Sequence, residues 1–284
     1  MNKIVLVLFF TGLMSTCFSQ TYDREWATYF GDSSLWISGI AEDNGALFIV
    51  GKTTNSAYIE SLTSPSSFQP AYGGGETDGF MAKISEDGQL LWFSYYGGDG
   101  KDEITDIIKD GSAIYIVGKT ASDGMATIGA YQNSVEGSAD GFITSFDLDG
   151  HRNWHTYFGG EGEDEVISLT TDEGKLFIHG RTTSHTRIAT PGGFQETIHP
   201  NGVGGEYVNN FIAAFTNNGS KLWGTYYGLP TILNPSTFTS HQFLTGIAMN
   251  KTGIYVSGWD VHASDTSYYG TPGSLWKPSQ HLFL

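Results

Sequence analysis

The sequence predicts an all-β fold, a β-propeller of four-stranded antiparallel blades, and three observations lead to that prediction. A phrase of 45 residues from Asp140 to Ser184 recurs without a gap from Asp78 to Ser122. The phrase consists of short aromatic and β-branched runs separated by turn residues, as is typical of strands. These runs are apolar on both alternating faces, so each sheet needs cover on both sides. Identical sheets packed around an axis provide that cover.

Each repeat is predicted to be a small antiparallel sheet. One strand follows a turn and ends at a glycine, at Leu47–Gly51, Ile114–Gly118, Leu176–Gly180 and Ile254–Gly258; the four turns read EDNG, KDGS, DEGK and NKTG. A second pair, Phe142–Phe146 and Asn153–Phe158, is joined by a turn containing Asp-Gly. Asp, Asn and Gly tolerate the positive φ that tight hairpin turns require. Four strands per repeat follow from these two pairs.

Tryptophans mark the repeats and give their spacing. Trp26, Trp92, Trp154 and Trp223 are 66, 62 and 69 residues apart. The repeats therefore cover residues 26–91, 92–153, 154–222 and 223–284, the last one truncated, within a repeat domain of residues 20–284. We expect an incomplete ring. The alternative is a closed ring of four blades, in which Glu25–Gly31 completes the last sheet; a sandwich or a barrel would not explain the repeated phrase.

The first 19 residues are predicted to be a signal peptide. Lys3 is followed by an apolar run, Ile4–Met14, that is too short to span a bilayer, and small residues precede a cut after Ser19. A lipoprotein signal using Cys17 is the alternative. Because Cys17 is the single cysteine, the exported chain would hold no disulfide and no thiolate site. No later run is long enough for a membrane span, so we expect an extracellular or outer cell-surface protein.

The charge of the chain excludes one class of partner. Asp and Glu total 30 against 14 Lys and Arg, for a formal net charge of −16. Such a surface repels phosphate backbones, so nucleic acid is not expected as a partner.

Several phrases resemble the SBBP (seven-bladed β-propeller) repeat. They are TYFGGEGEDEVISLTTDEGKLFIHGRTTS, from Thr156 to Ser184, and IGAYQNSVEGSADGFITSF, from Ile128 to Phe146. The resemblance extends from Glu25 to about Trp276 and implies an exported, often surface-located bacterial protein with no established catalytic activity. The chain departs from the family pattern in two places. The first repeat lacks the Gly-Gly and acidic loop, and the fourth carries an insertion at Leu229–Phe243.

Two acidic, glycine-rich loops are candidates for a calcium site. Carboxylate oxygens are the ligands that Ca²⁺ prefers, and these loops supply Asp99, Asp102, Glu103, Glu161, Asp164 and Glu165. The competing interpretation is structural, because Asp102 and Asp164 occupy equivalent places in two repeats and can pin a turn by accepting backbone N–H bonds. We favour the structural role and expect no other cofactor.

Other repeated residues are expected to serve the fold. The tryptophans would pack between blades, and Asp78, Asp140 and Asn210 would lead the third strand of each repeat. His151 and His155 are four apart on a strand, about 13 Å, which is too far to share one zinc ion. The sequence contains no nucleophile elbow, phosphate-binding loop or dinucleotide fingerprint.

The sequence thus predicts a non-catalytic, secreted or cell-surface β-propeller that serves as a binding or scaffold module for an extracellular protein or polysaccharide. Two enzymatic alternatives remain. One is a glycan-degrading hydrolase or lyase, whose paired carboxylates would come from separate blades. The other is a quinoprotein dehydrogenase, since the phrase D-G-x-x-x-W resembles the tryptophan-docking motif of those enzymes.

Overall fold

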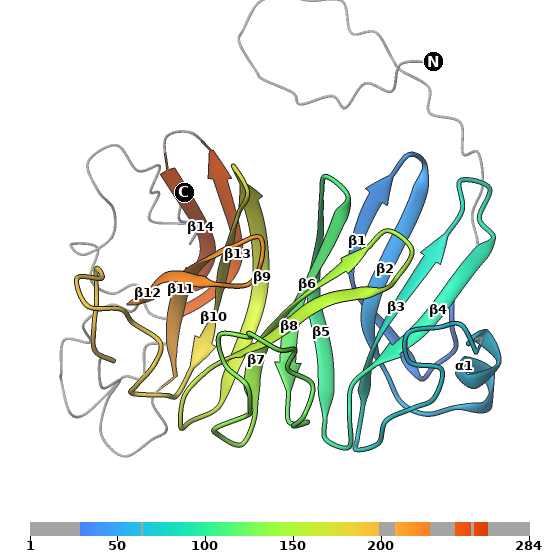
Figure 1. Cartoon of the computed structure of the whole chain (residues 1–284), viewed down its shortest axis with the longest axis horizontal. Helices are drawn as coiled ribbons and strands as arrows, with labels where there is room; N and C mark the ends of the chain where they lie inside the picture. Colours follow the sequence, from blue (N-terminus) through green and yellow to red (C-terminus); the bar gives the residue numbers. More distant parts are fainter. Residues whose placement is uncertain (1–28, 64, 199–207, 228–241, 251–252, 261–284) are drawn as a thin grey trace, which may run out of the picture.

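The computed structural model confirms an all-β chain of four-stranded antiparallel blades. It describes residues 29–63, 65–198, 208–227, 242–250 and 253–260 (Figure 1). In this part of the chain the strands form three four-stranded sheets and one two-stranded sheet. Their bounds follow. The first sheet comprises β1 (Leu35–Asp43), β2 (Ala46–Thr53), β3 (Asp78–Ile84) and β4 (Leu90–Tyr96); the second β5 (Asp102–Asp110), β6 (Ala113–Thr120), β7 (Asp140–Asp147) and β8 (Arg152–Phe158); the third β9 (Asp164–Asp172), β10 (Lys175–Thr182), β11 (Asn209–Thr216) and β12 (Lys221–Tyr227); the fourth β13 (Gln242–Asn250) and β14 (Gly253–Asp260).

Every complete sheet is a simple meander in which each strand pairs with its sequence neighbours. The first turns of the first and third sheets explain why these connections are so tight. Asn44 and Gly45 have φ of 50° and 89°, and Glu173 and Gly174 have φ of 48° and 73°. Two successive positive φ angles give the turn a twist that matches the twist of the paired strands. The expected hairpins are therefore present.

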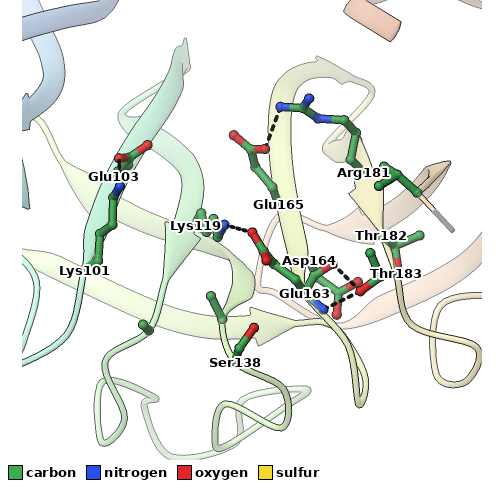
Figure 2. A pocket seen from close by; sticks show the side chains of 13 residues that line it. Lys101, Glu103, Lys119, Ser138, Glu163, Asp164, Glu165, Arg181, Thr182 and Thr183 are labelled. Carbon is green, nitrogen blue, oxygen red and sulfur yellow. Dashed lines mark hydrogen bonds and ion pairs between the residues drawn. The ribbon is translucent and has the colours of Figure 1, made fainter. Parts of the chain in front are cut away.

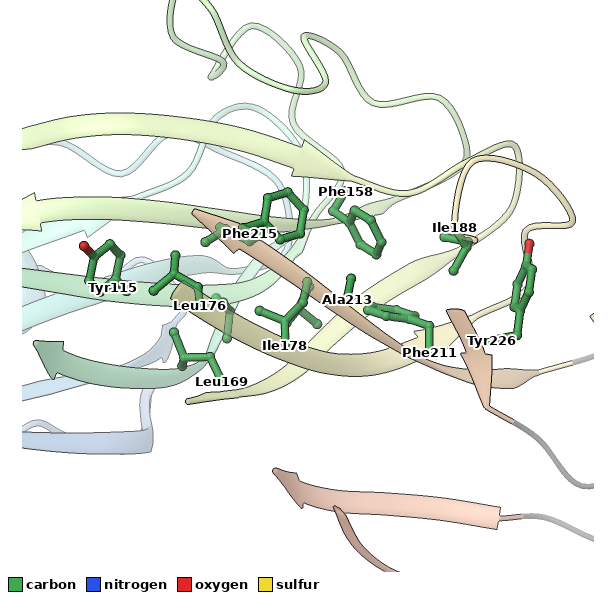
Figure 3. Close-up of a cluster of buried hydrophobic side chains, with 13 residues drawn as sticks. Tyr115, Phe158, Leu169, Leu176, Ile178, Ile188, Phe211, Ala213, Phe215 and Tyr226 are labelled. Carbon is green, nitrogen blue, oxygen red and sulfur yellow. The ribbon is translucent and has the colours of Figure 1, made fainter. Parts of the chain in front are cut away.

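The sheets pack face to face, with their first strands in series. β1 packs against β5, β5 against β9, and β9 against β13. Between the second and third sheets lies an apolar cluster to which both sheets contribute, shown in Figure 3, with Tyr115 and Phe158 from one side and Leu169 and Phe211 from the other. The corresponding cluster between the first and second sheets includes Phe48 and Ile104. The second sheet thus has the two-sided cover that the sequence predicted, whereas β1 of the first sheet exposes Ile37 and Ile40.

The first sheet is covered on its outer face in a different way. Helix α1 (Ala57–Leu62) lies in the β2–β3 connection, and its Ile59 is fully buried against β3 and β4. Phe30 adds a second contact, with its ring centroid 6.3 Å from that of Phe80 and 6.5 Å from that of Phe93. Ser56 caps the helix by accepting a hydrogen bond from the Ile59 N–H. Helix α1 and Phe30 therefore cover β3 and β4 on the face where, in the second and third sheets, the preceding sheet packs.

Among the described strands the ring is open, because β1 makes no substantial contact with β13 or β14. The segment Glu25–Gly31, proposed above to close a ring, lies mostly outside the described residues. Tyr29 and Phe30 are described, and they are not in a strand.

None of the described helices is long and apolar enough to span a membrane.

Candidate functional site

A pocket of about 610 Å³ opens between the second and third sheets, at the end where β5 and β9 begin (Figure 2). Because neighbouring strands run antiparallel, the ends of β6 and β10 lie at the same edge as the starts of β5 and β9. Figure 2 shows Lys101 and Glu103 on one side of the pocket and Glu165 and Arg181 on the other. This is the candidate site.

The charged groups of the pocket are arranged in ion pairs. Arg181 donates from Nη2 to Glu165 Oε2 at 2.8 Å, and Lys119 pairs with Glu163. Lys101 Nζ lies 3.3 Å from Glu103 Oε1. Each of these side chains keeps part of its surface in solvent, so a ligand can reach the pairs. Paired groups at an exposed site contribute little to stability, which leaves them available for binding.

Glu103 receives a second cation from the first sheet. Lys52 donates to its Oε1 at 2.9 Å. Burial acts to raise the pKa of Glu103, but the hydrogen bond from Lys52 and the charges of Lys52 and Lys101 outweigh it, so the pKa of this carboxyl is lowered. Glu103 is therefore ionised at neutral pH and links the first sheet to the pocket wall.

The accessible charges of the pocket balance. Three cations, Lys101, Lys119 and Arg181, face three carboxylates, Glu103, Glu163 and Glu165. A fourth acid, Asp164, is fully buried behind them, where it accepts hydrogen bonds from the Gly160 N–H at 2.8 Å and the Ser184 hydroxyl at 2.7 Å. Two further wall residues are the exposed Ser138 and Val208. The pocket thus presents donors and acceptors without a strong excess of either charge.

The six calcium candidates of the acidic loops do not gather around one point. Asp99 is exposed, Glu103 and Glu165 are paired with cations, and Glu161 accepts from the His185 N–H at 2.7 Å and from the Thr186 hydroxyl at 2.6 Å. Within the described ranges, no three Asp, Glu, His or Cys side chains are placed to hold a metal ion.

The two remaining candidates, Asp102 and Asp164, have the same hydrogen-bond partners in successive repeats. Asp102 accepts from the Gly98 N–H at 2.8 Å and the Ser122 hydroxyl at 2.7 Å, which matches the Asp164 contacts given above. Both side chains fix the start of a first strand to the end of the neighbouring second strand. This geometry is that of the turn-pinning role favoured in the sequence analysis.

One of the three residues predicted to lead the third strands, Asn210, was assigned to the wrong position. Asp78 lies opposite Thr53, and Asp140 lies opposite Thr120, but the residue opposite Thr182 is Asn209. Asn210, which the sequence assigned to this place, instead lies where Gly79 and Gly141 lie in the other sheets. Alignment of NNF with the DGF of the other two repeats also puts Asn209 at the Asp position, so the strand register and the sequence agree on Asn209.

Asp78 and Asp140 each bind a loop glutamine. Asp140 Oδ2 accepts from Gln132 Nε2 at 2.5 Å, and Asp78 Oδ2 accepts from Gln69 Nε2 at 3.2 Å. Burial raises the pKa of Asp140 to about 7, and the nearby charge of Asp164 adds to that effect. Burial likewise raises the pKa of Asp78 to about 6. Both carboxyls are fully buried, so they serve the fold and not a ligand.

Two of the four marker tryptophans lie between sheets. Trp92 lies against Gly150, in the β7–β8 turn of the next sheet: a Cβ added to Gly150 would be 3.2 Å from the Trp92 ring. Trp154 lies against Gly219 in the same way, with a distance of 2.9 Å. Trp154 also donates from Nε1 to the Asn217 carbonyl at 3.1 Å. Trp223 contacts Phe177 within its own sheet, and Trp26 lies outside the described residues.

Sequence reasoning missed the cations of the pocket. Lys52, Lys119 and Arg181 each sit between a glycine and a threonine at the end of a second strand. This repeated Gly-basic-Thr phrase was the available signal. Lys52 and Lys119 meet carboxylates of the following repeat, so these two pairs could be seen only in three dimensions, whereas Arg181 pairs with Glu165 of its own sheet.

No family model and no curated protein matches the chain. Solved structures that resemble it include the following three. A computationally designed protein, Ika4, has 8% identity and a TM-score of 0.35, over 81% of this chain and 88% of that one. The phage phi92 endosialidase has 12% identity and a TM-score of 0.32, over 83% of this chain and 34% of that one. The Trypanosoma rangeli sialidase in complex with sialic acid has 10% identity and a TM-score of 0.24, over 82% of this chain and 52% of that one. The chain therefore spans about a third and about half of the two natural proteins.

Proposed function

We propose that this chain is a non-catalytic binding module, whose ligand lies in the pocket between the second and third sheets. The observation that carries the proposal is the pairing of every accessible carboxylate in the pocket with a cation. A glycoside hydrolase needs one protonated and one ionised carboxyl at the same bond. Lys52 and Lys101 lower the pKa of Glu103, so this carboxyl is a poor proton donor. Binding is the function that this geometry favours.

The ligand we propose is a neutral, hydroxyl-rich polysaccharide. A sugar hydroxyl both donates and accepts hydrogen bonds, and so fits a wall of alternating cations and carboxylates. A strongly anionic or cationic ligand would meet repulsion from one half of the pocket, because the accessible charges balance. The exposed Ser138 hydroxyl adds a neutral donor and acceptor beside Lys119 and Glu163.

Calorimetric titration of the purified protein with neutral oligosaccharides, namely glucan, mannan, galactan and xylan fragments, tests this proposal. We expect saturable binding without cleavage products. Lys119→Glu should weaken binding at least about tenfold, because it removes a donor and leaves Glu163 unpaired. Lys175→Glu is the matched control, since it makes the same change of charge at an exposed position outside the pocket. Release of reducing ends would overturn the non-catalytic role, and equal effects of the two variants would overturn the site.

We also propose that the chain is an SBBP-type propeller that acts outside the cell. The support is the resemblance of the repeat phrases together with the signal-like residues 1–19. Expression with and without residues 1–19, followed by detection in the cell-surface and culture fractions, tests the location. Retention of the complete chain inside the cell would contradict it.

A further inference from the structure

The boundary between the first and second sheets, at the start of β5, has the same backbone framework as the boundary that holds the pocket, at the start of β9. We call these the first edge and the pocket edge. The Asp102 N–H donates to the Thr77 carbonyl at 2.8 Å at the first edge, and the Asp164 N–H donates to the Ala139 carbonyl at 2.9 Å at the pocket edge. The residues next to these four therefore occupy equivalent positions at the two edges.

The side chains of the first edge form a network of ion pairs. Lys52, on β2, donates to Glu103 Oε1 at 2.9 Å. Lys101 Nζ lies 3.3 Å from Glu76 Oε2 and 3.3 Å from Glu103 Oε1. The side chains of Lys52, Lys101 and Glu76 are 36%, 46% and 74% exposed, so a ligand can reach them. Two cations face two carboxylates, and the first edge thus has the balanced charge of the pocket.

The cation of the second strand acts alike at both edges. Lys52 in β2 and Lys119 in β6 each reach a carboxylate of the following sheet, Glu103 and Glu163 respectively. The two edges differ at the residue before the bonded carbonyl, because Glu76 of the first edge is replaced by the shorter Ser138 at the pocket edge. Both edges therefore offer hydrogen-bond donors and acceptors to a neutral ligand, with different side chains in one equivalent place.

The two edges also share residues. Lys101 and Glu103 line the pocket, as Figure 2 shows, and the same two side chains bind Glu76 and Lys52 at the first edge. A ligand that contacts Lys101 or Glu103 from within the pocket is therefore already at the boundary of the first edge.

We propose that the ligand is an extended polysaccharide chain that occupies the first edge as well as the pocket, which rests on the binding function proposed above. A polysaccharide repeats the same hydroxyl groups along its length, and the two edges repeat a similar set of donors and acceptors. Sheets packed face to face lie about 10 Å apart, so one sugar ring cannot contact both edges, whereas an oligosaccharide can. Binding of some rings in the pocket places the next rings beside the first edge at a high effective concentration.

Calorimetric titration with disaccharides and hexasaccharides of the same glucan, mannan, galactan and xylan series tests the extended site. The hexasaccharide should bind at least about tenfold more tightly than the disaccharide of the same sugar, because only the longer chain reaches both edges. Glu76→Lys should reduce this length advantage at least about fivefold, since it removes an acceptor and places a third cation beside Lys52 and Lys101.

Glu86→Lys is the matched control for the change of charge. Glu86 is exposed in the β3–β4 turn, at the end of the first sheet opposite to the first edge, so the variant should keep the length advantage. Circular dichroism should show folded protein for both variants, because Glu76 and Glu86 are exposed. Lys119→Glu, within the pocket, should weaken the binding of both lengths.

The outcomes separate the extended site from the pocket. Equal affinities for the two lengths would overturn the extended site and leave the pocket as the whole site. A length advantage that Glu76→Lys does not change would likewise overturn it. Failure of every disaccharide and hexasaccharide to bind would overturn the proposed function of the pocket, and the extended site with it.

Discussion

The hydroxyl oxygen of Tyr96 in the first sheet lies 2.5 Å from Nδ1 of His155 in the second. The Thr144 hydroxyl lies 2.8 Å from the same nitrogen. Burial lowers the pKa of His155 to about 3, with a smaller contribution from the Arg152 charge. A neutral imidazole therefore joins two sheets inside an apolar interface, at the place that Phe93 occupies in the first sheet.

The buried histidine predicts a loss of stability in mild acid. The unfolded chain takes up a proton near the ordinary histidine pKa of 6.5, whereas the folded chain does so only near 3. Stability from this residue is thus lost as pH falls below 6.5. His155→Phe should remove that component, measured as the difference between denaturant unfolding at pH 7.5 and pH 5. His151→Phe, on an exposed turn, should keep the wild-type difference; an equally large difference in His155→Phe would contradict the prediction.

Asp140 predicts the opposite dependence at higher pH. Its folded pKa is raised from 3.8 to about 7, so the folded chain binds this proton more tightly than the unfolded chain. The contribution is complete below pH 3.8 and is lost as pH rises through 7. In Asp140→Asn, the change in unfolding free energy between pH 5 and pH 8 should be smaller than in the wild type by about 1–3 kcal/mol. The exposed Asp149→Asn serves as a control in the same denaturation series, and a steeper slope in Asp140→Asn would argue against the shared burial of Asp140 and Asp164.

Gly118 is required by a close approach of two strands. A Cβ at this position would lie 1.9 Å from the Glu103 carbonyl oxygen, and the same distance recurs at Gly51 and Gly180. Gly118→Ala should cost about 3 kcal/mol of unfolding free energy, because two backbones must separate. Gly124→Ala isolates the effect of a positive φ, since Gly124 has φ of 77° and an added methyl group would meet no atom within 4 Å; it should cost about 1 kcal/mol. Similar costs for both variants in urea unfolding would refute the steric explanation.

Trp154 predicts how much the contact between neighbouring sheets contributes. Trp154→Ala removes the ring that lies on Gly219 and the hydrogen bond to the Asn217 carbonyl. We expect a loss of about 2–4 kcal/mol, measured by thermal and urea unfolding. Trp36→Ala removes an indole that is half exposed and should cost less than about 1 kcal/mol. If the two losses are equal, Trp154 does not couple the sheets.

Chelation tests the calcium hypothesis directly. Because Asp102 and Asp164 use their oxygens to fix turns and Glu103 and Glu165 pair with cations, we expect EDTA to leave Tm unchanged. Calorimetry with and without added Ca²⁺ provides the measurement. A rise in Tm with Ca²⁺ that Asp164→Asn abolishes would establish the acidic loops as an ion site.

Local chemistry explains why most of the fold could be predicted. Turns such as Asn44–Gly45 are recognisable because few residues accept a positive φ. The assignment of Asn210 was wrong by one position, since the phenylalanine of NNF aligns with that of DGF, and the pairing of Asn209 with Thr182 shows the correct residue. The pocket could not be predicted at all, since Lys119 meets Glu163 across 44 residues of chain.

The sequence by itself determined the strands, their hairpin turns and the need of each sheet for cover on two faces, because these depend on side-chain volume, polarity and backbone freedom within one repeat. Tertiary structure alone decided how successive repeats meet: which charges pair around the pocket, which carboxyls lose their water, and which face of β1 stays open. The physical reason is that ion pairing and desolvation depend on distances between distant segments, and no local pattern specifies those distances.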